Sequence, residues 1–212
     1  MTSQYTIGEI HNSEWIDVAK LIAHAVPNAL ISKLGNKFGG KFYSKLVLQD
    51  YSCGYVAKSV SGNIVGLIIG TLDYPKARSI AFKGQLAKLI ITANFRLLTW
   101  SVIGWVIKGI LAKDRDEKQG HKDRPAADLI AIAVCSKARG TGLAQKLVEE
   151  MEKFMTSKGL GGPYKILTEK ANTRANKFYE KIGAKLIRTN MHHGRAINEW
   201  HKEIIPAKKN SD

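Results

Sequence analysis

Two short fragments in the second half of the chain hold residue types suited to binding a phosphorylated ligand and moving a proton. The first is Arg139-Gly140-Thr141-Gly142-Leu143-Ala144, which follows an apolar run ending at Val134. Glycines let the backbone approach a ligand closely, and the free N–H groups at a helix start favour a pyrophosphate. The fragment lacks the Gly-Lys-Ser/Thr of a nucleoside-triphosphate loop and the third glycine of the dinucleotide fingerprint. The alternative is a glycine-rich turn before a core helix.

The second fragment places an amide and a phenol at a fixed spacing. Asn172 stands at the predicted start of a helix, and Tyr179 follows beside Phe178. A phenol, whose pKa is about 10, can donate a hydrogen bond or a proton to a departing thiolate. The alternative is that Asn172 only caps the helix and Tyr179 only packs against its neighbours.

The elements that must position these fragments follow from hydrophobic periodicity and turn residues. A buried strand is predicted over residues 127–134, a helix over 140–156, a strand over 164–168 and a helix over 173–181. The other predicted elements are a strand at 5–10, a helix ending near 24, helical segments over 30–48 split at 35–40, a hairpin with strands 54–60 and 64–72, and final strands 184–189 and 196–205.

Taken together, the fragments resemble the GNAT superfamily of N-acetyltransferases. One motif of this superfamily is Arg/Gln-x-x-Gly-x-Gly/Ala after the fourth strand, and the other is Asn-x-x-Ala-x-x-Phe-Tyr-x-x-x-Gly after the fifth. The matching residues are Arg139, Gly142 and Ala144 in the first, and Asn172, Ala175, Phe178, Tyr179 and Gly183 in the second.

The resemblance covers most of the chain and implies its fold class. This is a mixed α/β fold with a central, mostly antiparallel, twisted sheet of about seven strands, flanked by helices, in which the fourth and fifth strands splay apart. We expect one domain over residues 1–205 and a polar tail over 206–212. A helical insertion over about 76–113 falls between the third and fourth strands, where the general family has only a short connection.

In this superfamily the pantetheine arm of acetyl-CoA pairs with the exposed backbone of the fourth strand. By resemblance, acetyl-CoA is therefore the co-substrate and contacts Ile132, Ala133 and Val134. The other residues that the resemblance assigns to coenzyme binding are Arg139, Gly140, Thr141, Gly142, Leu143, Ala144, Gln145, Asn172 and Tyr179. Lys137, Arg139 or Lys146 can add positive charge for the phosphates.

The same resemblance makes Tyr179 the acid that protonates the departing thiolate. The base that deprotonates the amine is open between three residues. Asp128 lies near the start of the fourth strand, where histone acetyltransferases of this superfamily carry a longer glutamate, so a bridging water is expected. Glu169 is the second candidate and His24 the third. The bacterial ribosomal-protein acetyltransferases have a glutamate where this chain has Leu167.

The charge of the chain attracts anions. Its 33 Lys and Arg against 18 Asp and Glu give a formal net charge of +15, which suits nucleic acid, anionic lipid or phosphorylated small molecules. The two cysteines, Cys53 and Cys135, fit a reducing compartment, and we expect a cytoplasmic protein. We expect no metal, because His192, His193 and His201 have no acidic or cysteine partners at ligand spacing.

The acceptor is expected to be the primary amine of a small molecule, which attacks acetyl-CoA directly in a ternary complex. The cationic insertion favours an amino sugar or another small anionic amine. The pattern His24-Ala25-Val26-Pro27, Leu34-Gly35 and Phe42-Tyr43 is similar to relatives encoded among polysaccharide-synthesis genes. A protein or peptide amine is the alternative acceptor.

The alternative class is a non-enzymatic basic module that binds nucleic acid or a membrane surface. Nucleic acid is not favoured, because the aromatic residues are not interleaved with the basic ones in a recognisable binding motif. The apolar insertion at 76–113 must contact the body of the domain, a second subunit in a homodimer, or a membrane surface.

Overall fold

The computed structural model describes residues 5–82, 124–192 and 194–204. The chain divides into two compact units, one formed by residues 1–81 and 125–212 and the other by residues 82–124. Most of the predicted insertion at 76–113, with its dimer and membrane hypotheses, lies outside the described residues. The first unit carries both motif fragments.

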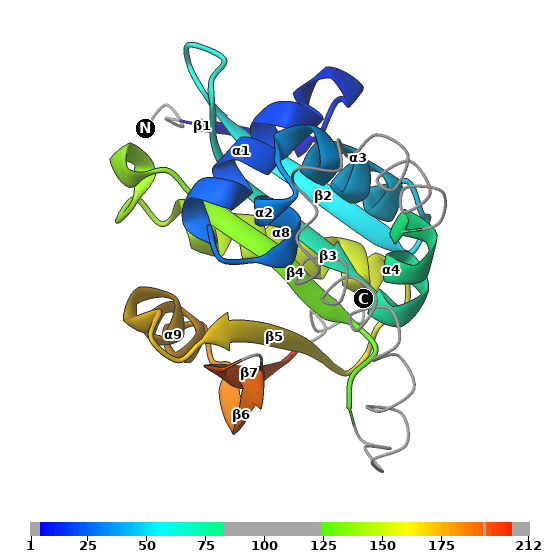
Figure 1. The fold of residues 1–212 in the computed structure, drawn as a ribbon, viewed down its shortest axis with the longest axis vertical. Coiled ribbons are helices and arrows are strands. Elements are labelled where there is room, and N and C mark those ends of the chain that lie inside the picture. Colours follow the sequence, from blue (N-terminus) through cyan, green and yellow to red (C-terminus); the bar gives the residue numbers. More distant parts are fainter. Residues whose placement is uncertain (1–4, 83–123, 193, 205–212) are drawn as a thin grey trace, which may run out of the picture. The chain divides into compact units, whose positions relative to one another are not determined.

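A seven-stranded mixed sheet runs through the first unit in the order β1-β2-β3-β4-β5-β7-β6 (Figure 1). The strands are β1 (Tyr5–Glu9), β2 (Ser52–Ser59), β3 (Ile64–Thr71), β4 (Asp128–Val134), β5 (Pro163–Glu169), β6 (Lys185–His192) and β7 (Arg195–Glu203). All neighbours are antiparallel except β4 and β5, which are parallel. The predicted fold class is therefore confirmed.

The parallel pair in the middle of the sheet is short. β4 and β5 pair only through Asp128 with Lys165 and Leu129 with Ile166. On its other side β4 continues to pair with β3 as far as Val134. Figure 1 shows β4 and β5 diverging beyond their junction. The splaying predicted for the fourth and fifth strands is thus present, and it leaves part of one edge of β4 without a strand partner among the described residues.

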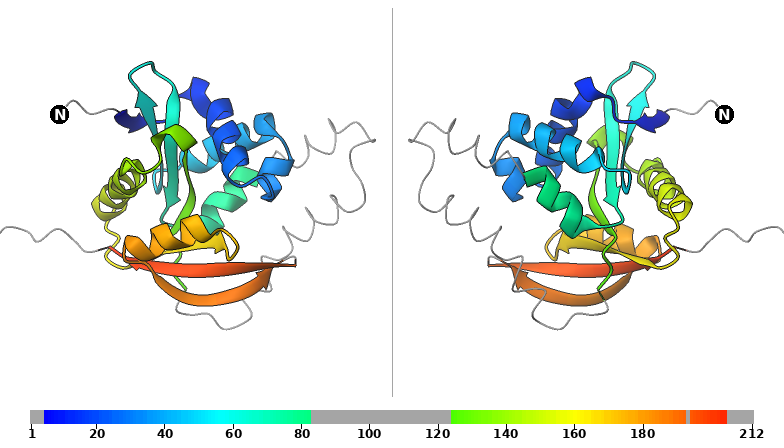
Figure 2. Two further views of the ribbon diagram at one scale, coloured as in Figure 1. Left: turned by 90° about the vertical axis from the view of Figure 1, so that its left-hand side faces the viewer. Right: turned by 90° about the vertical axis from the view of Figure 1, so that its right-hand side faces the viewer.

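Helices cover both faces of the sheet. The helices are α1 (Trp15–Ala25), α2 (Leu30–Lys33), α3 (Asn36–Val47), α4 (Tyr74–Phe82), α8 (Leu143–Ser157) and α9 (Thr173–Lys181), with short 3₁₀ turns at Asn12–Glu14 and Ser136–Ala138. Helices α1 and α3 contact β3 from one side, and α8 packs on β2 and β3 from the other (Figure 2). The helix predicted at 173–181 has the bounds expected for it.

Glycines within α3 correct one prediction. The split expected at residues 35–40 is confined to the short connection between α2 and α3, and Gly39 and Gly40 lie inside the helix. A Cβ atom added to Gly40 would lie 3.0 Å from the carbonyl oxygen of Trp15 in α1. The glycines therefore allow α3 to pack closely on α1, and this contact outweighs their poor helix propensity of about 1 kcal/mol.

A proline follows β3 closely. Pro75 lies in the first turn of α4, which starts at Tyr74. Proline is well tolerated there because the first N–H groups of a helix have no intrahelical acceptor. The start of α4 thus follows β3 after only two residues.

Glycines in β3 set how closely α8 approaches the sheet. A Cβ atom at Gly70 would lie 2.5 Å from Sδ of Met151 and 3.1 Å from Cε of Met155. Both methionines are fully buried, so they have little room to move. Glycine at this position is therefore part of the core packing.

We expect Gly70→Ala to lower the free energy of unfolding by about 1–3 kcal/mol, because it overpacks the contact with α8. Gly8→Ala in β1 is the matched control, since a Cβ atom there meets nothing within 4 Å. That control should stay within about 0.5 kcal/mol of the parent protein. Urea unfolding of the three proteins measures both values, and equal effects of the two substitutions would contradict the packing argument.

Candidate functional site

The loop between β4 and α8 takes its shape from two glycines. Gly140 and Gly142 have φ angles of 79° and 81°, in the left-handed region that other residues adopt only with strain. The predicted helix from residue 140 therefore starts at Leu143, with Gly142 at its N-cap. A Cβ atom at either glycine would meet nothing within 4 Å, so the space in front of the loop is open.

This loop presents backbone donors to that open space. The first N–H groups of α8 have no intrahelical acceptor, because they precede the first full turn. Within the loop, Thr141 Oγ1 donates a hydrogen bond to the carbonyl of Ala138 at 2.8 Å. Arg139 Nε donates to the carbonyl of Val134 at 3.1 Å, which ties the loop to the end of β4. The arrangement suits an anion at the helix start.

Along the free edge of β4, the direction of the main-chain N–H and C=O groups can be assigned residue by residue. The N–H of Cys135 donates to the carbonyl of Val65, 2.8 Å away in the direction of β3. Because main-chain groups alternate along a strand, those of Ala133 also point towards β3. Ile132 and Val134 therefore direct their main-chain groups to the open edge. Of the three residues predicted to contact the coenzyme through the backbone, Ile132 and Val134 lie in the required orientation.

The turn between β5 and α9 is built by two asparagines. Asn172 is the N-cap of α9, and its Oδ1 accepts a hydrogen bond from the N–H of Ala175 at 3.2 Å. Asn176 is a hydrogen-bonding centre that the sequence reasoning missed. Its Nδ2 lies within 3.1 Å of the carbonyl oxygens of Glu169, Lys170 and Asn172.

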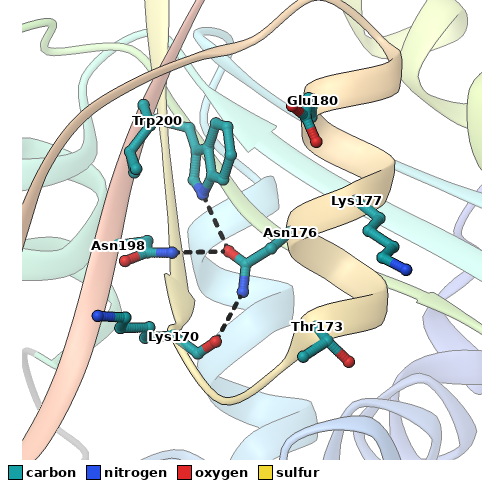
Figure 3. Close-up of a pocket in the computed structure, with 8 residues that line it drawn as sticks. Lys170, Thr173, Asn176, Lys177, Glu180, Asn198 and Trp200 are labelled. Atoms are coloured by element: carbon teal, nitrogen blue, oxygen red, sulfur yellow. Dashed lines mark hydrogen bonds between the residues drawn. The ribbon is translucent and has the colours of Figure 1, made fainter.

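The other end of the Asn176 amide faces β7. Its Oδ1 accepts hydrogen bonds from Asn198 Nδ2 at 3.0 Å and from Trp200 Nε1 at 3.1 Å (Figure 3). One side chain thus fastens the β5–α9 turn to the sheet. No local sequence signal predicts this role, because Asn198 and Trp200 lie more than twenty residues away in the chain.

Tyr179 lies in the core. Its side chain is 5% exposed and packs against Phe178 and Trp200, with ring centroids 5.6 and 6.4 Å away. Burial raises the pKa of its phenol well above the usual value, and the negative charge of Asp128 raises it further. The phenol therefore holds its proton at neutral pH, and its pKa is sensitive to the charge of Asp128.

Asp128 forms a buried ion pair. One of its carboxylate oxygens lies 3.1 Å from Nζ of Lys165, its register partner on β5. The two side chains are 5% and 9% exposed. The pair lies at the junction from which β4 and β5 diverge, and the sequence reasoning assigned no role to Lys165.

The other two base candidates lie elsewhere. Glu169 is ion-paired with Arg195, whose Nη2 also donates to the carbonyl of Asn28 at 3.4 Å. Glu169 stands four residues after Lys165 on β5, which is about 13 Å along an extended strand. His24 is exposed in the last turn of α1. Of the three candidates, Asp128 is the one whose charge is felt by Tyr179.

A cavity of about 290 Å³ opens where α9 faces β6 and β7 (Figure 3). Its lining residues are Lys170, Thr173, Asn176, Lys177, Glu180, Leu186, Asn198 and Trp200. Neither Asn172 nor Tyr179 contributes to it, so this cavity is separate from the residues that the motifs identify.

The described residues, 5–82, 124–192 and 194–204, contain neither a candidate metal site nor a candidate membrane span. None of these residues forms a cluster of three or more His, Cys, Asp or Glu side chains suited to a metal ion. No helix within residues 5–82, 124–192 and 194–204 is long and apolar enough to cross a bilayer.

The burial of three tyrosine side chains predicts that the folded protein becomes less stable at alkaline pH. Burial raises the pKa of Tyr43, Tyr164 and Tyr179, and nearby carboxylates add to the rise for the last two. In the unfolded chain these phenols ionise near pH 10, so their contribution to stability is complete below that pH and is lost above it. We expect the free energy of unfolding to fall above pH 10 by up to about 1.4 kcal/mol per pH unit for each phenol. Urea unfolding from pH 8 to 11 measures this, and a constant value would contradict it.

Comparisons with known proteins identify the family of the chain. The family model for the "Acetyltransferase (GNAT) family" matches residues 36–184. A GNAT acetyltransferase from Streptococcus pneumoniae superposes with a TM-score of 0.57 at 14% identity, covering 94% of this chain and 99% of that one. A GNAT acetyltransferase from Staphylococcus aureus Mu50 gives 0.60 at 11% identity, covering 95% and 99%. The ribosomal-protein-S18-alanine N-acetyltransferase from Escherichia coli gives 0.56 at 12%, covering 97% of each chain. No curated protein sequence matches the chain significantly.

The structural likenesses have identities too low to show more than a shared fold. The family model does show more, because it spans most of the 212 residues and includes the free edge of β4, the glycine loop and the β5–α9 motif. Enzymes of this family transfer an acetyl group from acetyl-CoA to an amine. The resemblance found in the sequence is confirmed, and the chain belongs to the GNAT family as an acetyl-CoA-dependent N-acetyltransferase.

Proposed function

We propose that this enzyme acetylates the primary amine of a small acceptor that carries an anionic group, such as an amino sugar linked to phosphate. The amine attacks the thioester directly while both substrates are bound. The observation that carries the catalytic part is that a buried phenol, Tyr179, has its pKa raised by burial and by the charge of a buried carboxylate, Asp128, which lies at the junction of β4 and β5.

The two groups divide the proton transfers between them. Asp128 accepts a proton from the acceptor ammonium through a bridging water, which leaves a neutral amine able to attack. The carbon–sulfur bond of the tetrahedral intermediate then breaks, and Tyr179 gives its proton to the departing thiolate. The proton that the nitrogen of the new amide loses returns Tyr179 to its protonated form, and the proton on Asp128 passes to water. The raised pKa of Tyr179 favours this role, because the phenol remains protonated until charge builds on the sulfur.

Coenzyme binding follows from the loop and the strand edge. The N–H groups at the start of α8 and the positive-φ glycines suit the pyrophosphate of acetyl-CoA. The main-chain groups of Ile132 suit an extended, amide-containing arm that lies along β4, much as a strand pairs with a sheet edge. Asn172 contributes by fixing the start of α9, since its side-chain oxygen is used as the helix cap.

The preference for an anionic acceptor is supported by charge near the end of β5. Arg195 contacts Glu169 at the end of β5 and Asn28 in the connection between α1 and α2. These contacts use two of the five N–H donors of its guanidinium, so donors remain for a phosphate or carboxylate. The net charge of +15 attracts such acceptors over a longer range.

The test compares two matched primary amines, one phosphorylated and one not, with a peptide amine as a third acceptor. Release of free coenzyme A thiol measures turnover at low and high ionic strength. We expect the phosphorylated amine to have about tenfold higher kcat/KM, with an advantage that shrinks as salt screens the contact. Arg195→Gln should reduce the advantage, whereas Lys20→Gln, which removes an equal charge from the exposed face of α1, should not. Equal efficiency for both amines, without salt dependence, would reject the anionic acceptor.

The base has its own prediction. Asp128→Asn keeps the shape of the side chain and removes its basicity. We expect kcat/KM to fall by about 100-fold near neutral pH and the acidic limb of its pH profile to disappear. Acetyl-CoA affinity, measured by calorimetry, should change little. An acidic limb that survives in Asp128→Asn would assign the base to another residue.

A further inference from the structure

The ion pair between Asp128 and Lys165 needs an explanation that packing does not give. Removing two charges from water costs several kcal/mol for each ion, and well-packed apolar residues are often as stable or more stable in such places. Both side chains are less than a tenth exposed. Lys165 takes no part in the proton transfers proposed above, so its burial has no role assigned so far.

The pair also lies at the short junction of the two strands. Asp128 and Lys165 form one of the two residue pairs between β4 and β5, and the strands diverge beyond the second. Pairing with Thr71 of β3 and Lys165 of β5 fixes the backbone of Asp128 but not its carboxylate. The Nζ–Oδ2 contact of 3.1 Å is a side-chain contact across the junction that acts on the carboxylate itself.

Ionisable groups approach this pair from several elements. Tyr74 of α4 has its ring centroid 5.8 Å from Nζ of Lys165, and its phenol is influenced by both Asp128 and Arg78. Tyr179 of α9 is influenced by Asp128. On β7, His201 is the register partner of Lys165.

A row of ionisable side chains continues across the sheet through His201. Its Nε2 lies 2.9 Å from Glu199, whose carboxylate also accepts hydrogen bonds from Arg188 of β6. Glu199 is thus paired with an arginine and a histidine. A buried carboxylate in this region therefore does not need a lysine as its partner. Lys165 places a cation in direct contact with the carboxylate of the candidate base.

We propose that Lys165 is the positioning residue of the catalytic base: its ammonium group keeps the Asp128 carboxylate ionised and fixed at the β4–β5 junction. This inference rests on the proposed function, in which Asp128 is the base. Without the ammonium group, a carboxylate buried among phenols would bind a proton at higher pH and would be occupied when the acceptor amine needs it. Lys165 itself neither gains nor loses a proton in the reaction.

The experiment uses the full-length protein and the variants Lys165→Met, Lys165→Gln, Lys165→Arg and Asp128→Asn. Carbon-13 NMR follows the carboxyl titration of Asp128, identified by the resonance that Asp128→Asn lacks. The pH profile of kcat/KM with a primary amine gives the acidic limb. Calorimetry with acetyl-CoA reports whether the fold and the coenzyme site are intact. Lys165→Gln keeps a hydrogen-bond donor without charge and serves if Lys165→Met does not fold.

We expect the uncharged variants to raise the midpoint of the Asp128 titration by about one to three pH units. The acidic limb should move by the same amount, which lowers kcat/KM about tenfold for each unit on that limb. Lys165→Arg should restore both midpoints towards those of the parent protein. Affinity for acetyl-CoA should stay within about twofold, because Lys165 lies outside the predicted coenzyme contacts.

Each contrary result has a distinct meaning. A titration midpoint that does not move in the uncharged variants overturns the role of Lys165 alone. An acidic limb that stays while the midpoint moves, or that persists in Asp128→Asn, overturns the proposed base and, with it, the role of Lys165 in the reaction. Absence of acetyl transfer to any amine by the parent protein overturns the proposed function itself.

Discussion

Gly142→Asp is expected to weaken acetyl-CoA binding by about 100-fold or more. Gly142 has a φ angle of 81°, and a residue with a side chain pays about 1–2 kcal/mol to adopt it. The added carboxylate would project into the open space before α8, where it repels the pyrophosphate. Like charges in contact cost several kcal/mol, and each 1.4 kcal/mol is a tenfold change in affinity. Isothermal calorimetry with acetyl-CoA measures the loss.

Gly159→Asp is the matched control for this prediction. Gly159 also has a positive φ, 85°, and a Cβ atom there likewise meets nothing within 4 Å. It follows the other end of α8, about 22 Å from Gly142 by helix length. The control carries the same backbone strain and the same charge, yet it should leave acetyl-CoA affinity within about twofold. If both variants lose affinity equally, or if Gly142→Asp loses none, the loop does not bind the pyrophosphate.

Tyr179→Phe should reduce turnover by about 100-fold and change acetyl-CoA affinity little. The phenol proton is needed only as the carbon–sulfur bond breaks, so its loss raises the barrier without weakening the ground-state complex. The aromatic ring remains, and with it the packing against Phe178 and Trp200. Steady-state release of thiol gives kcat, and calorimetry gives the affinity.

Tyr164→Phe separates this effect from the loss of any buried hydroxyl. Tyr164 is fully buried and donates a hydrogen bond to Glu152 at 2.8 Å, and it has no part in the proposed proton transfers. Its loss should cost about 1–3 kcal/mol of stability and leave kcat within about twofold. Were Tyr179→Phe to retain more than half of the parent kcat, the acid would have to be another group.

Local chemistry explains which parts of the site could be predicted from the sequence. The glycines of the β4–α8 loop and the cap at Asn172 act on their immediate neighbours in the chain, so residue type and spacing reveal them. The mostly antiparallel sheet of about seven strands, with its splayed fourth and fifth strands, followed from the resemblance to a known family. These predictions needed no knowledge of which distant side chains meet.

The parts that were missed depend on contacts between distant segments. Lys165 meets Asp128 only because β4 and β5 pair in one register. Asn176 looks like a polar position on a helix until β7 brings Asn198 and Trp200 to it. Gly40 looks like a helix breaker, and its value appears only when the backbone of α1 lies 3.0 Å from its missing Cβ.

The short junction between β4 and β5 also bears on how the protein unfolds. In their main-chain pairing, the strands β1 to β4 and the strands β5, β7 and β6 are two ribbons joined by two residue pairs. Such weakly joined ribbons can open independently, at a lower free energy than global unfolding. A molecule of acetyl-CoA held along β4 and at the start of α9 would bridge both ribbons. Bound acetyl-CoA would then connect the two ribbons, and their unfolding would become more cooperative while the substrate is bound.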